Sequence, residues 1–198
     1  SPFVFDDIEH VASNPAIQIS DLTFKNLKQA AVESPLSARP ITYITFAINY
    51  FFHEHEVYGY RLFNMAIHML NGLLLFFFLV NTFKLPLLQG KIKQPFWVAY
   101  IATLIWIVHP LQTQSVTYIM QRMNSLATLF YMLAFLCYLK ARLSSSKKRW
   151  LCAVASFISG LLALGSKEIA VTLPFFILLY EWMFFQDMDF VWLKRNTI

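Results

Sequence analysis

Charged residues are scarce in this chain of 198 residues, of which they make up only 14%. A soluble domain carries about 25% charged residues, so the shortage argues against a soluble globular protein. Hydrophobic residues make up 58% of the chain, and 20 Phe, 9 Tyr and 5 Trp add to the apolar surplus. The composition therefore predicts an integral membrane protein.

Cysteine is nearly absent as well. Cys137 and Cys152 both lie in apolar runs near the expected cytoplasmic ends of helices, where thiols stay reduced. This usage excludes a disulfide framework, and neither residue has the neighbours of a metal site. A signal peptide is also lacking at Ser1, and the chain does not start with Met. We therefore expect the sequence to be part of a longer protein.

Five apolar stretches can cross a bilayer, which takes a helix of about 20 residues, if the shorter ones borrow a turn from their flanks. They cover residues 60–83, 92–108, 116–139, 150–164 and 169–185. Residues 41–52 are apolar but too few to span, so we expect them to lie in the interface or to re-enter. The prediction is an all-α, polytopic helical membrane protein with about five spanning helices. Residues 60–198 form this transmembrane region, and residues 1–59 form an extracytosolic loop with short interfacial helices.

The basic residues are unevenly distributed along the chain. Ten of the sixteen fall in segments that this topology places on one side: Lys84, Lys91, Lys93, Lys140, Arg142, Lys147, Lys148, Arg149, Lys194 and Arg195. Because loops rich in Lys and Arg stay in the cytosol, residues 1–59 are expected on the periplasmic or lumenal side. The same bias explains the net charge of +5, which therefore does not indicate a nucleic-acid partner.

Polar residues that are costly beside hydrocarbon collect at the outer side of this topology. Asp6 and Asp7 form an adjacent carboxylate pair. One carboxylate can remove a proton from an acceptor hydroxyl while the other orients it, or the pair can hold a divalent cation against phosphate. A solvated acidic loop is the alternative.

The first predicted span carries a polar stripe. Arg61, Asn64, His68 and Asn71 are spaced three, four and three residues apart, so they share one face of the helix. Arg61 lies at the outer end, where it can reach a phosphate. The deeper His68 and Asn71 are interpreted as hydrogen-bond partners between helices.

The region between the second and third predicted spans is also polar. His109 ends the second span, and Gln114, Tyr118 and Arg122 follow at spacings of four, which predicts a common helix face. An arginine two turns inside a span needs an anionic partner, either a protein carboxylate or a ligand phosphate. Alternatively, Arg122 reaches the surface as an anchor.

Lys167 and Glu168 lie in the very short outer connection between the last two predicted spans. They read either as an exposed ion pair or as part of a site. Together with Arg39, Arg61 and Arg122, Lys167 gives four outer basic groups that face the acidic pair. Cations that hold a phosphate leaving group, with a carboxylate that activates an acceptor, suit sugar transfer from a lipid phosphate.

The order of several motifs resembles a known family. These motifs are Phe3-Val4-Phe5-Asp6-Asp7, Asn14-Pro15, Arg39-Pro40, Gly59-Tyr60-Arg61 with Asn64, His68 and Asn71, His109-Pro110-Leu111-Gln112-Thr113-Gln114 with Tyr118 and Gln121-Arg122, and Ser166-Lys167-Glu168 with Leu173-Pro174 and Tyr180-Glu181. Nearly the whole chain is similar to the membrane half of the transmembrane and tetratricopeptide-repeat glycosyltransferases. These are GT-C enzymes that use polyprenyl-phosphate sugars.

The resemblance implies roles for individual residues. Asp6 and Asp7 become the catalytic pair, and the candidates for the donor phosphate are Arg39, Arg61, Arg122 and Lys167. We expect His109, Gln114, Tyr118 and Glu168 to line the substrate site. The family often has Glu where this chain has Gln114, and an amide there can bond a sugar hydroxyl but cannot act as a base. The family's first span precedes the acidic motif and would lie before Ser1.

The leading hypothesis is therefore a membrane glycosyltransferase that moves a sugar, mannose by resemblance, from a polyprenyl phosphate to a hydroxyl of a protein or another acceptor. No cofactor is certain, and a divalent cation is a candidate. The alternative is a non-catalytic membrane subunit that keeps the pocket and scaffolds or holds lipid, packing against partners through faces that include Phe76, Phe77 and Phe78. A transporter is a weaker alternative. The polar groups gather at one face of the membrane, whereas a transporter usually binds its substrate near the midplane.

Overall fold

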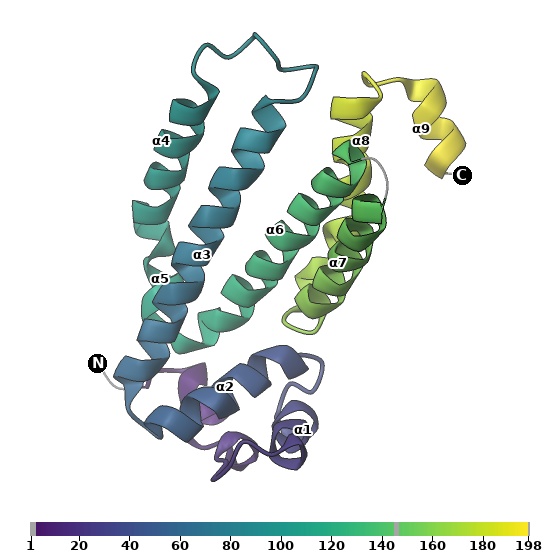
Figure 1. Cartoon of the computed structure of the whole chain (residues 1–198). Coiled ribbons are helices and arrows are strands. Elements are labelled where there is room, and N and C mark those ends of the chain that lie inside the picture. Colours follow the sequence, from purple (N-terminus) through teal and green to yellow (C-terminus); the bar gives the residue numbers. More distant parts are fainter. Residues whose placement is uncertain (1–2, 145–146, 198) are drawn as a thin grey trace.

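The computed structural model describes residues 3–144 and 147–197, and the described residues form helices and no strands. The predicted all-α class is therefore confirmed. Long helices run side by side, and a group of short helices packs across one end of them (Figure 1). We call this end, which carries the N-terminus, the outer end.

The outer region consists of four short helices. They are η1 (Ile8–Ala12), η2 (Pro15–Ile17), α1 (Phe24–Glu33) and α2 (Pro40–His53). Local sequence starts three of them. Asn14 accepts a hydrogen bond from the backbone N–H of Ala16, Thr23 accepts one from Asn26, and Pro40 occupies the first turn of α2. With 14 residues, α2 is too short to span, and it lies across the ends of the long helices (Figure 1).

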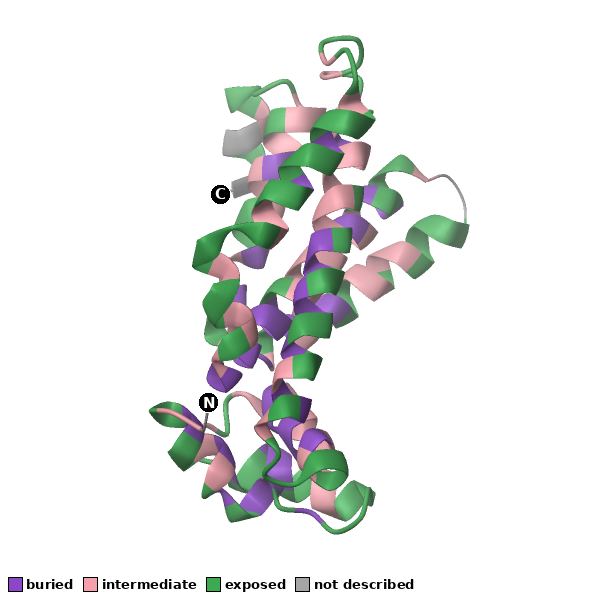
Figure 2. Cartoon of the chain, turned by 90° about the vertical axis from the view of Figure 1, so that its left-hand side faces the viewer, coloured by how far each residue is buried: buried purple, intermediate pink, exposed green. Residues whose placement is uncertain are grey.

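All five predicted spans appear as helices. They are α3 (Val57–Phe83), α4 (Pro95–Val108), α6 (Arg122–Leu143), α7 (Lys147–Leu164) and α8 (Leu173–Phe185), and α9 (Phe190–Thr197) follows. Exposed residues, drawn green in Figure 2, run along the flanks of these helices. Many of them are large and apolar, such as Ile105, Phe157 and Phe175, as expected for surfaces that face lipid. The predicted division at residue 59 falls within the first turn of α3.

Fewer helices are long and apolar enough to cross a membrane than the five predicted. Within the described residues there are three, Val57–Phe83, Ile119–Leu143 and Glu168–Phe185, and a fourth if the bent pair Pro95–Val108 and Pro110–Thr117 is one span. The prediction of about five is therefore roughly confirmed, with one or two spans fewer. The reason is α7, whose first three residues are Lys147, Lys148 and Arg149, so that its apolar part is only about 15 residues long against the 20 that a span needs.

The chain breaks twice between α4 and α6. His109 is extended because it precedes Pro110, and the next two helices, η3 (Pro110–Gln112) and α5 (Thr113–Thr117), bend by 54° from α4. Tyr118 is extended again before η4 (Ile119–Gln121) leads into α6. The predicted common helix face of Gln114, Tyr118 and Arg122 is therefore wrong, because these residues lie on three different segments.

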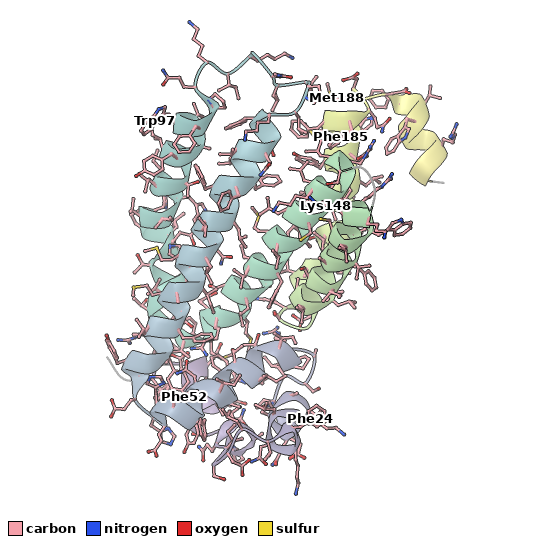
Figure 3. The ribbon with its side chains drawn as sticks, in the orientation of Figure 1. Phe24, Phe52, Trp97, Lys148, Phe185 and Met188 are labelled. Carbon is pink, nitrogen blue, oxygen red and sulfur yellow. The ribbon has the colours of Figure 1, made fainter. Side chains whose placement is uncertain are left out.

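Two apolar clusters hold the molecule together. The outer cluster joins Val11, Ile17, Tyr43, Phe46, Tyr60 and Met123, and the inner one joins Leu85, Phe135, Leu139 and Tyr180. Between them α6 packs against α3 on one side and α7 on the other. Aromatic side chains occur at both ends, with Phe24 and Phe52 at the outer end and Trp97 and Phe185 at the other (Figure 3), a distribution typical of membrane interfaces.

Candidate functional site

The amino end of α6 is the point on which the predicted site residues converge. Asp7 bonds to Met120, Arg39 to Met123, and Lys167 to Asn124. Arg122 lies between these contacts. Residues predicted from four distant parts of the sequence therefore gather at one end of the helices, as expected.

Arg122 is fully buried, with 0% exposure. Its Nε donates to Asn64 Oδ1 at 2.7 Å, its Nη2 to Asn49 Oδ1 at 2.7 Å and to the Tyr60 carbonyl at 3.0 Å, and its Nη1 to the Thr45 carbonyl at 3.2 Å. The guanidinium thus uses neutral oxygens where a carboxylate or phosphate was expected.

Aromatic rings complete the enclosure of Arg122. The guanidinium carbon lies 4.6 Å from the ring centroids of both Phe46 and Phe63, and 5.6 Å from that of Tyr60. Cation–π contacts of this kind are strongest away from water. Arg122 joins α2, α3 and α6, and in this structure no part of it is open to a donor phosphate. Both predicted roles, phosphate ligand and snorkelling anchor, are corrected to a structural one.

The two predicted catalytic carboxylates differ in their surroundings. Asp7 is 1% exposed, and its Oδ1 accepts the N–H of Met120 at 2.9 Å, while its Oδ2 accepts that of Val4 at 3.4 Å. It therefore satisfies a backbone N–H of η4, the turn that leads into α6. Burial raises the pKa of Asp7, although its backbone hydrogen bonds lower it. Asp6 next to it is exposed, so the pair holds one anchored and one accessible carboxylate.

A cavity of about 550 Å³ opens beside this pair. Arg61, Gln114, Thr117 and Tyr118 line it together with Val4 and Phe5, which precede the acidic residues. Arg61 donates to the Thr117 carbonyl at 3.3 Å. Burial, together with the negative charges of Asp6 and Asp7, raises the pKa of the hydroxyl of Tyr118, the residue that links α5 to η4. The structure thus brings together three predicted site residues from different elements.

Arg39, Lys167 and Glu168 form a second group. The Nε of Arg39 bonds to both carboxylate oxygens of Glu168, at 3.0 and 3.2 Å. The Nζ of Lys167 donates to Asn124 Oδ1 at 2.6 Å. Burial, with the charge of Arg39, lowers the pKa of Lys167. The Arg39–Glu168 pair fixes the outer region to η5 (Glu168–Thr172), and the Lys167–Asn124 bond fixes the connection between α7 and η5 to α6.

His109 does not line the described cavities. It is exposed, and its Nδ1 accepts the N–H of Leu111 at 3.2 Å, which caps η3. Its predicted substrate contact is therefore unsupported by this arrangement, in which the imidazole stabilises the break after α4.

A protein-family model matches most of this chain. The model described as dolichyl-phosphate-mannose-protein mannosyltransferase matches residues 28–198. The chain belongs to this mannosyltransferase family. This match confirms the resemblance drawn from the sequence motifs. Family membership and the apolar helices together identify an integral membrane protein.

Curated relatives of this mannosyltransferase-family chain include Protein O-mannosyl-transferase Tmtc3 of Drosophila melanogaster, 30% identical over 90% of this chain and 22% of that protein. Human Protein O-mannosyl-transferase TMTC3 is 27% identical over 90% of the chain and 19% of its own length. Human Protein O-mannosyl-transferase TMTC4 is 29% identical over 86% of the chain and 25% of its own length. The chain thus spans about a fifth to a quarter of these relatives. No solved structure matches it.

A second set of polar residues, at the start of α6, was not recognised from the sequence. Gln121, Asn124, Ser125 and Thr128 line a second cavity, of about 400 Å³, which also contains Gln114. Asn124, Ser125 and Thr128 lie on one face of α6, and Gln121 ends η4 directly before that helix. The same test that singled out the stripe from Arg61 to Asn71 would have found them.

The described residues provide no group of three or more His, Cys, Asp or Glu side chains that could hold a metal ion. Both oxygens of Asp7 already accept backbone N–H groups, which leaves Asp6 as the accessible carboxylate. This donor set does not fit a divalent cation held by protein alone, and the cation stays a prediction.

Proposed function

We propose that this protein is a membrane glycosyltransferase that moves mannose from a polyprenyl-phosphate donor to a hydroxyl of a protein acceptor. The observation that carries the proposal is the 550 Å³ cavity, in which Arg61, Gln114 and Tyr118 lie beside the acidic pair at one end of the membrane helices. Membership of the mannosyltransferase family supports the choice of sugar. The activity is proposed for the whole protein, of which the relatives indicate that this chain is a part.

Asp6 is the proposed general base, because it is the accessible carboxylate of the pair. In a single displacement the acceptor oxygen attacks the anomeric carbon and gives its proton to Asp6. The bond between that carbon and the phosphate oxygen breaks, and the phosphate keeps the electron pair. Asp7 holds the segment in place through its bonds to Val4 and Met120.

Arg61 is the proposed partner of the departing phosphate. Its guanidinium shares the cavity with Gln114 and Tyr118, and a cation near the leaving oxygen stabilises charge that grows in the transition state. Arg39 and Lys167 remain candidates for the lipid phosphate, but each would first have to exchange its present partner, Glu168 or Asn124. Arg122 is no part of the proposal.

The proposed site faces the periplasm or the lumen. Lys148 lies toward the end of the helices that is opposite to Phe24 and Phe52 (Figure 3), and the basic residues of the α3–α4 connection lie at that far end too (Figure 1). The bias of Lys and Arg toward cytosolic loops supports this orientation.

Charge removal at the acidic pair tests the proposal. Asp6→Asn in the full-length protein should reduce mannose transfer from polyprenyl-phosphate mannose to a peptide by at least about a hundredfold, the usual contribution of a positioned base. Glu9→Gln is the matched control, because it removes an exposed carboxylate three residues away and should leave transfer intact. Full transfer by Asp6→Asn, with the protein folded, would exclude the mechanism.

A second candidate function is a non-catalytic subunit that binds other membrane proteins. The exposed apolar side chains on α4 and α7, such as Ile101, Ile105 and Phe157, favour it. Of the aromatic face predicted to pack on partners, however, Phe78 lies inside this chain against Phe135 and Tyr180, with ring centroids 5.6 Å apart in each pair. Stoichiometric co-purification with another subunit, together with absent transfer, would favour the scaffold.

A further inference from the structure

The 400 Å³ cavity between α3, α6 and the α4–α5 break differs in chemistry from the cavity of Arg61. Its lining groups are amides, hydroxyls, one imidazole, one indole and the apolar side chain of Leu111, and the lining includes no Asp, Glu, Lys or Arg. Its volume lies within the range of about 300–1,000 Å³ that is usual for ligand pockets. A neutral lining rich in donors and acceptors suits a polyhydroxylated group better than an ion.

Asn71 supplies a hydrogen-bond acceptor that the described part of the chain leaves unmatched. The side chain is 3% exposed, and its Nδ2 donates to the Ser125 carbonyl at 2.9 Å. Its Oδ1 has no hydrogen-bond partner among the described residues. Because a buried acceptor without a donor costs free energy, and because Asn71 lines the cavity, this oxygen is suited to a ligand hydroxyl.

The position of Asn71 along the membrane helix α3 bears on the choice of ligand. It lies 14 residues along α3 from Val57, which corresponds to roughly 21 Å at the rise of an α-helix. A protein acceptor approaches from water, whereas a sugar on a lipid phosphate is already held at the membrane. The lipid-linked sugar is therefore the better fit.

The wall of the cavity is held in place independently of any ligand. His68 Nε2 bonds to the Ile107 carbonyl at 3.0 Å, and its ring stacks on Trp106 with centroids 5.0 Å apart. Asn124 contributes its Nδ2 to Gln121 and its Oδ1 to Lys167. A site whose side chains are fixed in advance loses less entropy when it binds.

Gln114 lines both cavities, so the space with a cation and the space without one are adjacent. We propose that the hexosyl group of the donor occupies the neutral cavity and bonds to Asn71 Oδ1, while its phosphate lies near Arg61. This inference rests on the proposed function, and it assigns Asn71, Gln121, Asn124 and Thr128 to recognition of the sugar.

A comparison of two lipids distinguishes binding of the sugar from binding of the phosphate. Polyprenyl phosphate and polyprenyl-phosphate mannose are titrated into the full-length protein in lipid nanodiscs, and the ratio of the two Kd values is measured. The mannosyl lipid should bind wild type about tenfold tighter, and Asn71→Leu should bring the ratio close to one without changing the Kd of polyprenyl phosphate.

Thr103→Val is the matched control. Thr103 Oγ1 is the other described buried side-chain atom without a partner, but Thr103 does not line the cavity, so the ratio should stay at its wild-type value. If Asn71→Leu fails to fold, Thr128→Val replaces it, because Thr128 lines the cavity and is exposed; it should lower the ratio by about threefold.

The outcomes separate the two proposals. If polyprenyl phosphate binds but mannose adds no affinity, or if the cavity variants keep the wild-type ratio, the sugar site is excluded and the proposed transferase stands. If neither lipid binds wild type, the proposed function itself fails. A ratio lost in Asn71→Leu or Thr128→Val and kept in Thr103→Val supports the assignment.

Discussion

Replacing Arg122 with Leu distinguishes a structural arginine from one that binds the donor. The substitution removes the N–H groups that donate to Asn64 Oδ1 and Asn49 Oδ1. These two acceptors lie on different helices, which Arg122 bridges. Both asparagines are buried, so water does not replace the lost donors.

The expected cost follows from these two acceptors. Each unsatisfied buried group costs about 1–3 kcal/mol, and the loss of contacts with Phe46 and Phe63 adds to the cost. Part is offset, because Leu removes the penalty of burying a charge. We expect a net destabilisation of about 2–4 kcal/mol. For a domain of this size, this corresponds to a fall in Tm of about 5–15 °C.

The assay is thermal unfolding in detergent, read alongside binding of polyprenyl phosphate. Arg122→Lys keeps the charge but cannot reach both amide oxygens, so about half the fall in Tm is expected. Arg61→Leu is the complementary variant. It should leave Tm within about 2 °C of wild type, as for most surface substitutions, and should weaken binding of the lipid phosphate. An unchanged Tm with lost lipid binding in Arg122→Leu would refute the reasoning and return Arg122 to the phosphate site.

Two further predictions concern the anchored carboxylate and the α3–α4 contact. Burial raises the pKa of Asp7 above its ordinary value of 3.8, so the native state binds this proton more tightly than the unfolded state, and the associated stability is present below pH 3.8 and lost as the pH rises through the raised pKa. Thermal unfolding from pH 3.5 to 7 should therefore show wild type losing stability relative to Asp7→Asn, and a difference independent of pH would contradict this. A Cβ at Gly72 would lie 2.4 Å from Ile107 Cδ1, so Gly72→Ala should lower stability by about 1–3 kcal/mol. Adding Ile107→Ala should remove the clash, so the two substitutions should be coupled in a double-mutant cycle of unfolding free energy. Additive effects of the two substitutions would contradict this prediction.

Patterns within single helices were read correctly from the sequence. The stripe of Asn64, His68 and Asn71 predicts contacts between helices, and each side chain bonds to a backbone carbonyl of a neighbouring segment. Such a stripe is visible without a structure because one helix orients all its members. The short segment of residues 41–52 was likewise recognised as unable to span, because its length alone decides this.

The path of the chain between His109 and Arg122 was not predictable from periodicity. A spacing of four residues indicates one face only if the helix is continuous, and the extended Tyr118 interrupts it. The role of Arg122 was missed for a related reason. Its partners Asn49 and Asn64 come from other helices, and their amide oxygens carry no charge that would identify them as partners in a sequence.

Composition, hydropathy and motif order by themselves determined that this is a helical membrane protein of the mannosyltransferase family, because lipid exposure and helix periodicity act on each segment separately. Tertiary structure alone decided which polar groups remain open to a ligand. Packing of α2, α3 and α6 encloses Arg122, packing against η4 buries Asp7, and the bend after α4 places Gln114 in the walls of both cavities. These outcomes depend on contacts between segments far apart in the chain, and no local pattern records them.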